Sequence, residues 1–297
     1  MPEIPFAKGH ALGNDYIVID AADLGGLPAP ALVRALCDRH RGIGADGVLA
    51  GMLDGAPIRL RIFNPDGSEA EKSGNGLRIF GAYLHGRGLI ADAPFDIALA
   101  QEVVTLQVTG AGPGGVLDIR ADMGRASFRA EDVGFAPPGG AGEWAEGVVL
   151  SLGDGAAARV YPVSMGNPHC VIFADRLDRE DFLRRAPALA AHPAFTRGTN
   201  VQFARVSGPA RLDAWIYERG AGETLASGSS ACAIAAAAAR LGLVEAHEIT
   251  IRMPGGSVRV ELYDDARVRL RGPAQILYHG RLRAAVSESW LAPQTSS

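Results

Sequence analysis

Apolar and polar residues alternate in several short stretches of the chain, which is the pattern of a β-strand with one buried face. Arg59–Phe63 alternates in this way, and Asp213–Tyr217 does so again about half a chain later. Four more strands are predicted at Val103–Val108, Val116–Ala121, Ser257–Leu262 and Ala266–Leu270. Glycine and proline predict two loops, Gly110–Gly115 and Pro137–Gly142. The polar segment Ser287–Ser297 is expected to be loosely held.

Two further runs have the composition of helices, Gly76–Gly86 and Ser230–Gly242. The second contains the unbroken apolar stretch Ala231–Ala239. Because alanine is the strongest helix former and the stretch is apolar on all sides, we expect a central, buried helix there. The stretch is far too short to cross a membrane, which takes about 20 residues.

The chain also contains an internal repeat with a period near half its length. The segment around Asn14 recurs 153 residues later around Asn167, and Ser73-Gly74 recurs 154 residues later as Ser227-Gly228. In each half a strand leads through a glycine-bearing turn to a glutamate, then to Ser-Gly and a helical run. We therefore predict an α+β fold of two pseudo-symmetric domains, each a mixed sheet wrapped around one central apolar helix.

Composition narrows the class of protein further. Of the 297 residues, 47% are hydrophobic and 21% are charged, which is ordinary for a globular chain. The net charge of −4 argues against nucleic-acid binding as the main purpose. The 38 glycines follow no collagen-like period, so they are expected at turns and close backbone approaches.

Cysteine and histidine usage indicates neither a disulfide framework nor a metal site. Cys37, Cys170 and Cys232 are odd in number and widely spaced, which fits a reducing cytoplasm. The seven histidines show no paired ligand spacing, and the first residues show no signal-peptide pattern. Gly42–Gly47 fits G-x-G-x-x-G, but a turn and then a strand are expected there, not the strand–helix context of a dinucleotide site.

The two Ser-Gly helix starts are the main candidates for chemistry. A helix N-terminus offers unpaired N–H groups and a partial positive charge, and therefore binds carboxylates. Two such starts facing each other across a domain cleft would hold a substrate carboxylate with Ser73 and Ser227 on opposite faces of the adjacent carbon. That geometry suits removal of a proton from one face and return of a proton to the other. Alternatively, both serines are only helix N-caps.

Nine segments spread in order over nearly the whole chain carry a family resemblance: Lys8–Tyr16, Cys37–Gly47, Asn64–Glu71, Gly74–Arg78, Met165–His169, Gly198–Val201, Tyr217–Thr224, Pro254–Gly256 and Gly272–Ala274. With these segments the chain resembles the diaminopimelate epimerase family, amino-acid epimerases that work without pyridoxal phosphate. The resemblance implies two similar domains, residues 1–121 with 276–297 and residues 122–275, with the active site between them. It also implies a cytoplasmic, cofactor-free and metal-free isomerase of lysine biosynthesis. A small amino-acid substrate and a homodimer are expected, without nucleic-acid or membrane partners.

The resemblance also assigns roles to individual residues. The positions that hold the amino-acid substrate are Asn14, Asn64, Asn167, Asn200 and Arg219. Those that take the reacting carboxylate at the helix starts are Gly74, Asn75, Gly228 and Ser229, and polar residues beside the reacting centre are His169 and Glu218. The two proton-transfer positions, which are cysteines in the family, are Ser73 and Ser227.

The two serines are a sharp departure from the family, because a hydroxyl is a far weaker acid than a thiol and needs a base to activate it. Several explanations remain open. The chain is an engineered inactive form with two Cys→Ser substitutions, or a natural epimerase whose serines are activated by their neighbours. Another is a lyase or isomerase that removes one α-proton from a related amino acid, with His169 or Glu218 as the base. The last is a non-catalytic amino-acid-binding protein.

Overall fold

A computed structural model of the chain describes residues 3–136, 147–152 and 156–283. The predicted loop Pro137–Gly142 and the tail Ser287–Ser297 lie outside the described residues. The chain divides into two compact units, residues 1–121 with 272–297 and residues 122–271. The boundaries fall inside two strands, β8 (Leu117–Arg125) and β17 (Arg267–Arg283). In the structure the chain thus returns to the first unit at residue 272, where the sequence resemblance placed the return at 276.

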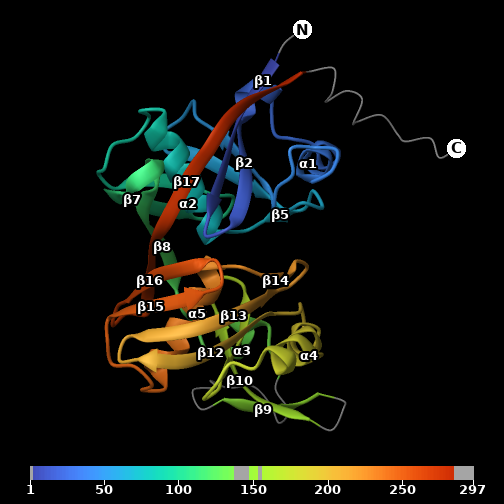
Figure 1. Ribbon diagram of the computed structural model, residues 1–297, viewed down its shortest axis with the longest axis vertical. Coiled ribbons are helices and arrows are strands. Elements are labelled where there is room, and N and C mark those ends of the chain that lie inside the picture. Colours follow the sequence, from blue (N-terminus) through green and yellow to red (C-terminus); the bar gives the residue numbers. More distant parts are fainter. Residues whose placement is uncertain (1–2, 137–146, 153–155, 284–297) are drawn as a thin grey trace, which may run out of the picture. The chain divides into compact units, whose positions relative to one another are not determined.

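In the first unit, strands enclose the helix α2 (Gly74–Gly86), which packs against β1, β2 and β7 (Figure 1). The remaining elements of this unit are β1 (Glu3–Ala11), β2 (Asn14–Asp20), η1 (Ala21–Leu24), α1 (Pro30–Cys37), β3 (Val48–Met52), β4 (Ile58–Phe63), β5 (Glu69–Ala70), β6 (Phe95–Ala98), β7 (Val103–Ala111) and η2 (Pro113–Gly115). The pairs β2–β3 and β4–β6 are parallel, because a helix crosses over between their strands, and the other pairs from β1 to β8 are antiparallel. β17 pairs with both β1 and β8, so the sheet closes around α2.

The second unit repeats this order around α5 (Gly228–Arg240), which packs against β10, β11, β12, β15 and β16. Its other elements are α3 (Ala130–Val133), β9 (Val148–Ser151), β10 (Ala157–Ser164), β11 (Pro168–Phe173), α4 (Arg179–Ala190), β12 (Asn200–Gly208), β13 (Arg211–Glu218), β14 (Gly222–Thr224), β15 (Glu248–Met253) and β16 (Gly256–Leu262). Here too the two parallel pairs, β11–β12 and β13–β15, flank helical crossovers. Strand for strand, β10–β17 pair as β1–β8 do. The predicted fold of two similar halves, each with a mixed sheet around an apolar helix, is therefore confirmed.

The boundaries of single elements differ from the sequence prediction where local pattern is weak. Both central helices begin two residues earlier than predicted, at Gly74 and Gly228. β7 continues through Ala111 into the predicted loop, and the rest of that loop contains a short helical turn. β17 is 17 residues long and far exceeds the predicted strand at Ala266–Leu270, because its alternation is interrupted by Gly272 and Pro273.

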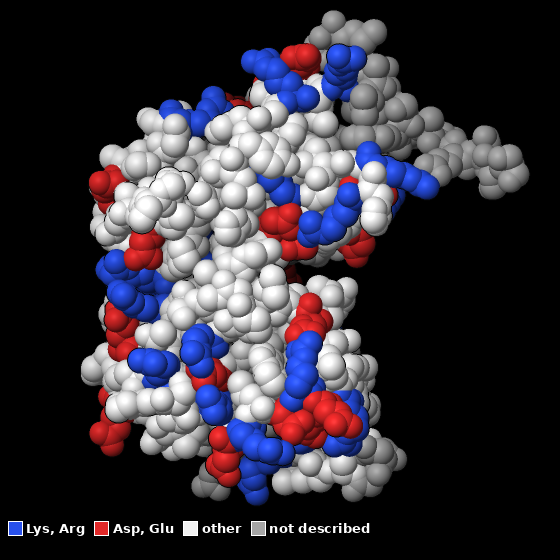
Figure 2. All heavy atoms as spheres, in the orientation of Figure 1, with Lys and Arg blue, Asp and Glu red and all other residues white. Residues whose placement is uncertain are grey.

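Both central helices are buried along almost their whole length, as their composition requires. In α5 the residues from Ser230 to Ala238 are buried, and in α2 even the Arg78 side chain is fully enclosed. All three cysteines are buried free thiols. Within the described residues no helix is long and apolar enough to cross a membrane. Basic and acidic side chains are interspersed on the face shown in Figure 2.

Candidate functional site

Ser73 forms the N-cap of α2 in the first unit. Its backbone is extended, and its Oγ accepts a hydrogen bond from the backbone N–H of Gly76 at 3.0 Å. The Tyr16 hydroxyl lies 3.2 Å from the same Oγ. Gly74, buried, is the first helical residue, so the positive end of the helix dipole lies directly beside the serine. This helix start can bind an anion, and the contacts of its serine hydroxyl are with a backbone N–H and a phenol.

Asn14 and Asn75 join the start of β2 to the first turn of α2. The Asn75 side chain donates from Nδ2 to Oδ1 of Asn14 at 3.0 Å. Arg78, one turn further along the helix, donates to Oδ1 of Asn75 at 2.7 Å and to the backbone oxygen of Gly74 at 3.1 Å. The predicted substrate residues Asn14, Gly74 and Asn75 are therefore brought together, and a fully buried guanidinium holds the helix start.

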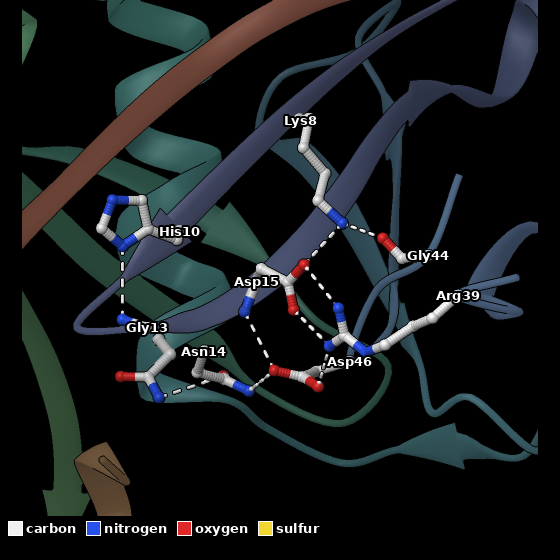
Figure 3. A network of polar contacts seen from close by, with 9 residues as sticks. Lys8, His10, Gly13, Asn14, Asp15, Arg39, Gly44 and Asp46 are labelled. Atoms are coloured by element: carbon white, nitrogen blue, oxygen red, sulfur yellow. Dashed lines mark hydrogen bonds and ion pairs between the residues drawn. The ribbon is translucent and has the colours of Figure 1, made fainter. Parts of the chain in front are cut away.

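A network of charged side chains adjoins Asn14 (Figure 3). Asn14 donates from Nδ2 to Oδ2 of Asp46 at 2.8 Å, and Arg39 donates to the carboxylates of both Asp46 and Asp15 at 2.7 and 2.8 Å. Buried Lys8 pairs with Asp15 at 2.6 Å. Burial alone would raise the pKa of Asp15, but the hydrogen bonds from Arg39 and Lys8 outweigh it and lower that pKa to about 2. The Asp15 carboxylate therefore stays ionised at neutral pH.

Asn64, the other predicted substrate residue of this unit, lies in the turn that follows β4. Its Nδ2 donates to Oγ of Ser68 at 3.0 Å, and its backbone N–H donates to the Ser68 carbonyl at 2.8 Å. These contacts fix Asn64 within its own turn. Its side chain is half-buried, and the hydrogen bond from its Nδ2 to Ser68 determines the orientation of its amide.

Ser227 occupies the equivalent place at the start of α5 in the second unit. Its side chain is buried, with 4% exposed, but it makes no capping hydrogen bond to the helix. Gly228 begins the helix and is buried, and Ser229 is half-buried beside it. The two helix starts thus share a backbone conformation, but only the Ser73 hydroxyl makes a capping hydrogen bond to its helix.

His169 is fully buried in β11 and holds Asn167 in place. Its Nε2 lies 2.9 Å from Oδ1 of Asn167, and its Nδ1 lies 3.0 Å from Nε2 of Gln202 on the neighbouring strand β12. Because an amide nitrogen only donates and an amide oxygen only accepts, the imidazole must carry its proton on Nε2 and be neutral. Gln202 also donates to Oγ of Ser230 at 3.0 Å in the first turn of α5.

Burial, and to a smaller extent the nearby positive charge of Arg219, lower the pKa of His169 to about 3. A histidine with both nitrogens engaged and so low a pKa is a weak general base at neutral pH. Its arrangement instead suits the positioning of Asn167, whose amide is turned with its oxygen towards the ring.

Asn200 and Arg219 meet at the end of β13. Oδ1 of Asn200 accepts from the backbone N–H of Arg219 at 2.9 Å. The exposed Arg219 guanidinium donates to the carbonyl of Arg197 at 2.6 Å. Glu218 precedes it as the half-buried last residue of β13. Within this unit the structure therefore gathers Asn167 with His169, and Asn200 with Arg219.

Several residues of these networks were missed as site residues in the sequence, among them Arg39, Asp46, Arg78 and Gln202. The first three lie in segments that carry the family resemblance, which was the available signal. Gln202 is a polar residue inside the apolar run that follows Asn200, a second signal. Among the described residues, no three His, Cys, Asp or Glu side chains gather as they would around a metal ion.

Comparison with known proteins supports the family resemblance. The family model for diaminopimelate epimerase matches residues 6–129 and 161–277. The chain is 40% identical over 283 residues to diaminopimelate epimerase 2 of a Nostoc species, covering 95% of this chain and 96% of that relative. It is also 40% identical over 281 residues to the diaminopimelate epimerase of Desulfitobacterium hafniense, covering 93% and 96%.

Solved structures share the fold at much lower sequence identity. A hydroxyproline epimerase from Agrobacterium vitis superposes with a TM-score of 0.68 at 14% identity, covering 96% of this chain and 95% of that one. A phenazine biosynthesis protein from Bacillus anthracis also gives a TM-score of 0.68, at 16% identity, covering 95% and 100%. These likenesses concern the fold alone, whereas the family model matches most of the chain and the relatives at 40% identity cover nearly all of it. The chain belongs to the diaminopimelate epimerase family, a family of isomerases.

Proposed function

We propose that this chain binds diaminopimelate, or an amino acid of the same kind, and that its two helix starts form the two halves of one epimerase site. Ser73 and Ser227 occupy the two proton-transfer positions. The α-carboxylate of the substrate is bound by the N–H groups at the starts of α2 and α5. Ser229 belongs to the groups at the start of α5 that take this carboxylate. Asn14, Asn64, Asn167, Asn200 and Arg219 bind the amine groups and the distal carboxylate, and Glu218 lies beside the reacting centre. No cofactor takes part.

The observation that carries the proposal is the repeated Ser-Gly start of a buried helix. When the α-proton leaves, negative charge spreads onto the carboxylate. Donors already aimed at that carboxylate stabilise the charge more in the transition state than in the ground state. The duplicated halves supply one such helix start each, so one position is available to remove the proton and the other to return one.

Hydroxyls at these positions limit the reaction. The hydrogen bond from Gly76 and the contact with the Tyr16 phenol provide Ser73 with no strong base. A thiol there has an ordinary pKa near 8.5, which a helix N-terminus lowers further, and thus supplies a thiolate. We therefore expect the chain with both serines to bind substrate and to invert it extremely slowly, while Ser73→Cys/Ser227→Cys inverts it at an enzymatic rate.

Incubation with diaminopimelate in D2O tests this expectation, with loss of the α-proton signal followed by NMR. We expect exchange with the doubly substituted chain and none with the chain as it stands. Ser207→Cys, at an exposed serine of β12, controls for a thiol placed elsewhere. The proposal is wrong if the doubly substituted, folded chain leaves the α-protons unexchanged, and a product other than the epimer would show a lyase or a different isomerase.

A further inference from the structure

A chain of hydrogen bonds with a fixed direction runs through the first unit's half of the proposed site. It begins at Arg78, passes through the amides of Asn75 and Asn14, and ends at Asp46, over donor–acceptor distances of 2.7, 3.0 and 2.8 Å. A guanidinium can only donate hydrogen bonds and a carboxylate can only accept them. Because the two ends are of these opposite kinds, both amides between them are forced into a single orientation.

Asp46 is itself prevented from turning. Its Oδ2 accepts from the backbone N–H of Asp15 at 3.1 Å as well as from Asn14, and its Oδ1 accepts from Arg39. Arg39 is held in turn by the Asp15 carboxylate, which Lys8 also binds. Lys8 donates further to the backbone oxygen of Gly44 (Figure 3). Two basic and two acidic side chains therefore alternate next to Asn14, and these hydrogen bonds hold the acceptor at the end of the hydrogen-bond chain in one place.

The segment between α1 and β3 is rich in glycine because its backbone passes close to the backbone of neighbouring elements. A Cβ on Gly42 would lie 2.0 Å from the carbonyl oxygen of Ala35, and a Cβ on Gly47 would lie 2.4 Å from that of Phe63. Gly44 has a φ of +78°, which favours glycine. These glycines bring Asp46 against Asn14, which gives the G-x-G-x-x-G pattern a structural task unrelated to nucleotides.

We propose that Asp46 is a positioning residue for the substrate: together with Arg78 it fixes which end of the Asn14 amide is presented to the bound amino acid. The inference rests on the proposed function, in which Asn14 contacts that amino acid. The two ends of an amide have nearly the same size but opposite hydrogen-bonding character. A 180° turn of Asn14 would thus exchange a donor for an acceptor and turn an attraction into a repulsion.

The test compares Asp46→Ala with Asp38→Ala in the chain as it stands. Asp38 lies in the same segment and accepts hydrogen bonds from the backbone N–H groups of His40 and Arg41. Its loss therefore disturbs the turn but removes no hydrogen bond of Asn14. Two quantities are measured for each: the Kd of meso-diaminopimelate by calorimetry, and the side-chain amide signals of Asn14 by ¹⁵N NMR without ligand. The Asn14 signals are identified by their absence in Asn14→Asp.

We expect Asp46→Ala to raise the Kd roughly tenfold or more, as for loss of a hydrogen bond to a charged group, and to shift the Asn14 amide signals. Asp38→Ala should change neither. If Asp46→Ala does not fold, Asp46→Asn keeps the size of the side chain, removes the fixed acceptor and should also move the Asn14 signals.

Unchanged Asn14 signals in a folded Asp46 variant would overturn the inference, and so would an unchanged Kd. Absence of binding by the unsubstituted chain would instead contradict the proposed function. The ligand-free NMR comparison still decides the role of Asp46 in that case, so the two failures can be told apart.

Discussion

His169 shows how a single residue can be assigned by its hydrogen-bond partners. Nε2 of Gln202 can only donate to one ring nitrogen, and Oδ1 of Asn167 can only accept from the other. Together with complete burial, these hydrogen bonds are compatible only with a neutral ring that carries its proton on Nε2. The residue is thereby better suited to orient Asn167 than to take a proton from the substrate.

Titration of the imidazole tests this assignment. The pKa of His169 in the folded chain is about 3, against an ordinary value of 6.5, so the ring should stay neutral from pH 8 to pH 4. The unfolded chain takes up a proton at this residue near pH 6.5, so its contribution to stability is present above that pH and is lost as the pH falls towards 3. Imidazole ¹⁵N shifts measured against pH provide the check, and a midpoint near 6.5 would contradict the assignment.

Residue types at the candidate site could be predicted from the sequence, but the hydrogen bonds between them could not. The repeat and the family resemblance pointed to Ser73, Ser227 and the asparagines. The orientation of the Asn14 amide, in contrast, depends on Asp46 and Arg78, which lie 32 and 64 residues away in the chain. Only the fold brings those charges to the two ends of the asparagine pair.

At the scale of elements, the two helix starts are alike in backbone and unlike in capping. Ser73 and Ser227 have nearly the same φ, −138° and −139°. Only the Ser73 hydroxyl accepts a hydrogen bond from its own helix, whereas Ser227 is buried without one. The side chain of Ser73 therefore contributes to the stability of α2 in a way that Ser227 does not contribute to α5.

Alanine substitutions should separate these two roles. We expect Ser73→Ala to lower the free energy of unfolding by about 1 kcal/mol, the usual cost of losing a serine N-cap, and Ser227→Ala to lower it by clearly less. Urea denaturation of each variant beside the unsubstituted chain measures both. Equal losses, or a larger loss for Ser227→Ala, would contradict the difference in capping.

Elements were predictable where periodicity was strong and missed where it was weak. The alanine-rich α5 and the alternating β4 and β13 appear close to their predicted bounds. The helix α4 was not predicted, because its charged first turns and internal Pro187 hide its pattern. Its N-cap, Asp178, accepts from the backbone N–H of Asp181 and was the available signal.

At the scale of the whole molecule, duplication explains more of the sequence than any single motif. The same succession of parallel and antiparallel pairs occurs twice. The repeated glutamates before the helix starts are each bound by an arginine, Glu69 by Arg61 and Glu223 by Arg179. These arginines come from different elements, β4 and α4, so the two halves keep the interaction although they supply it differently.

Our central claim is that each half contributes one proton-transfer position to a single substrate carbon. α-Proton exchange in D2O, measured for Ser73→Cys, Ser227→Cys and the double variant, tests this claim most directly. With one thiol, the proton is removed and replaced on the same face, so each single variant should exchange one configuration of the α-carbon without inverting it. The double variant should exchange and invert. Inversion by either single variant, or no exchange by the double variant, would contradict the claim.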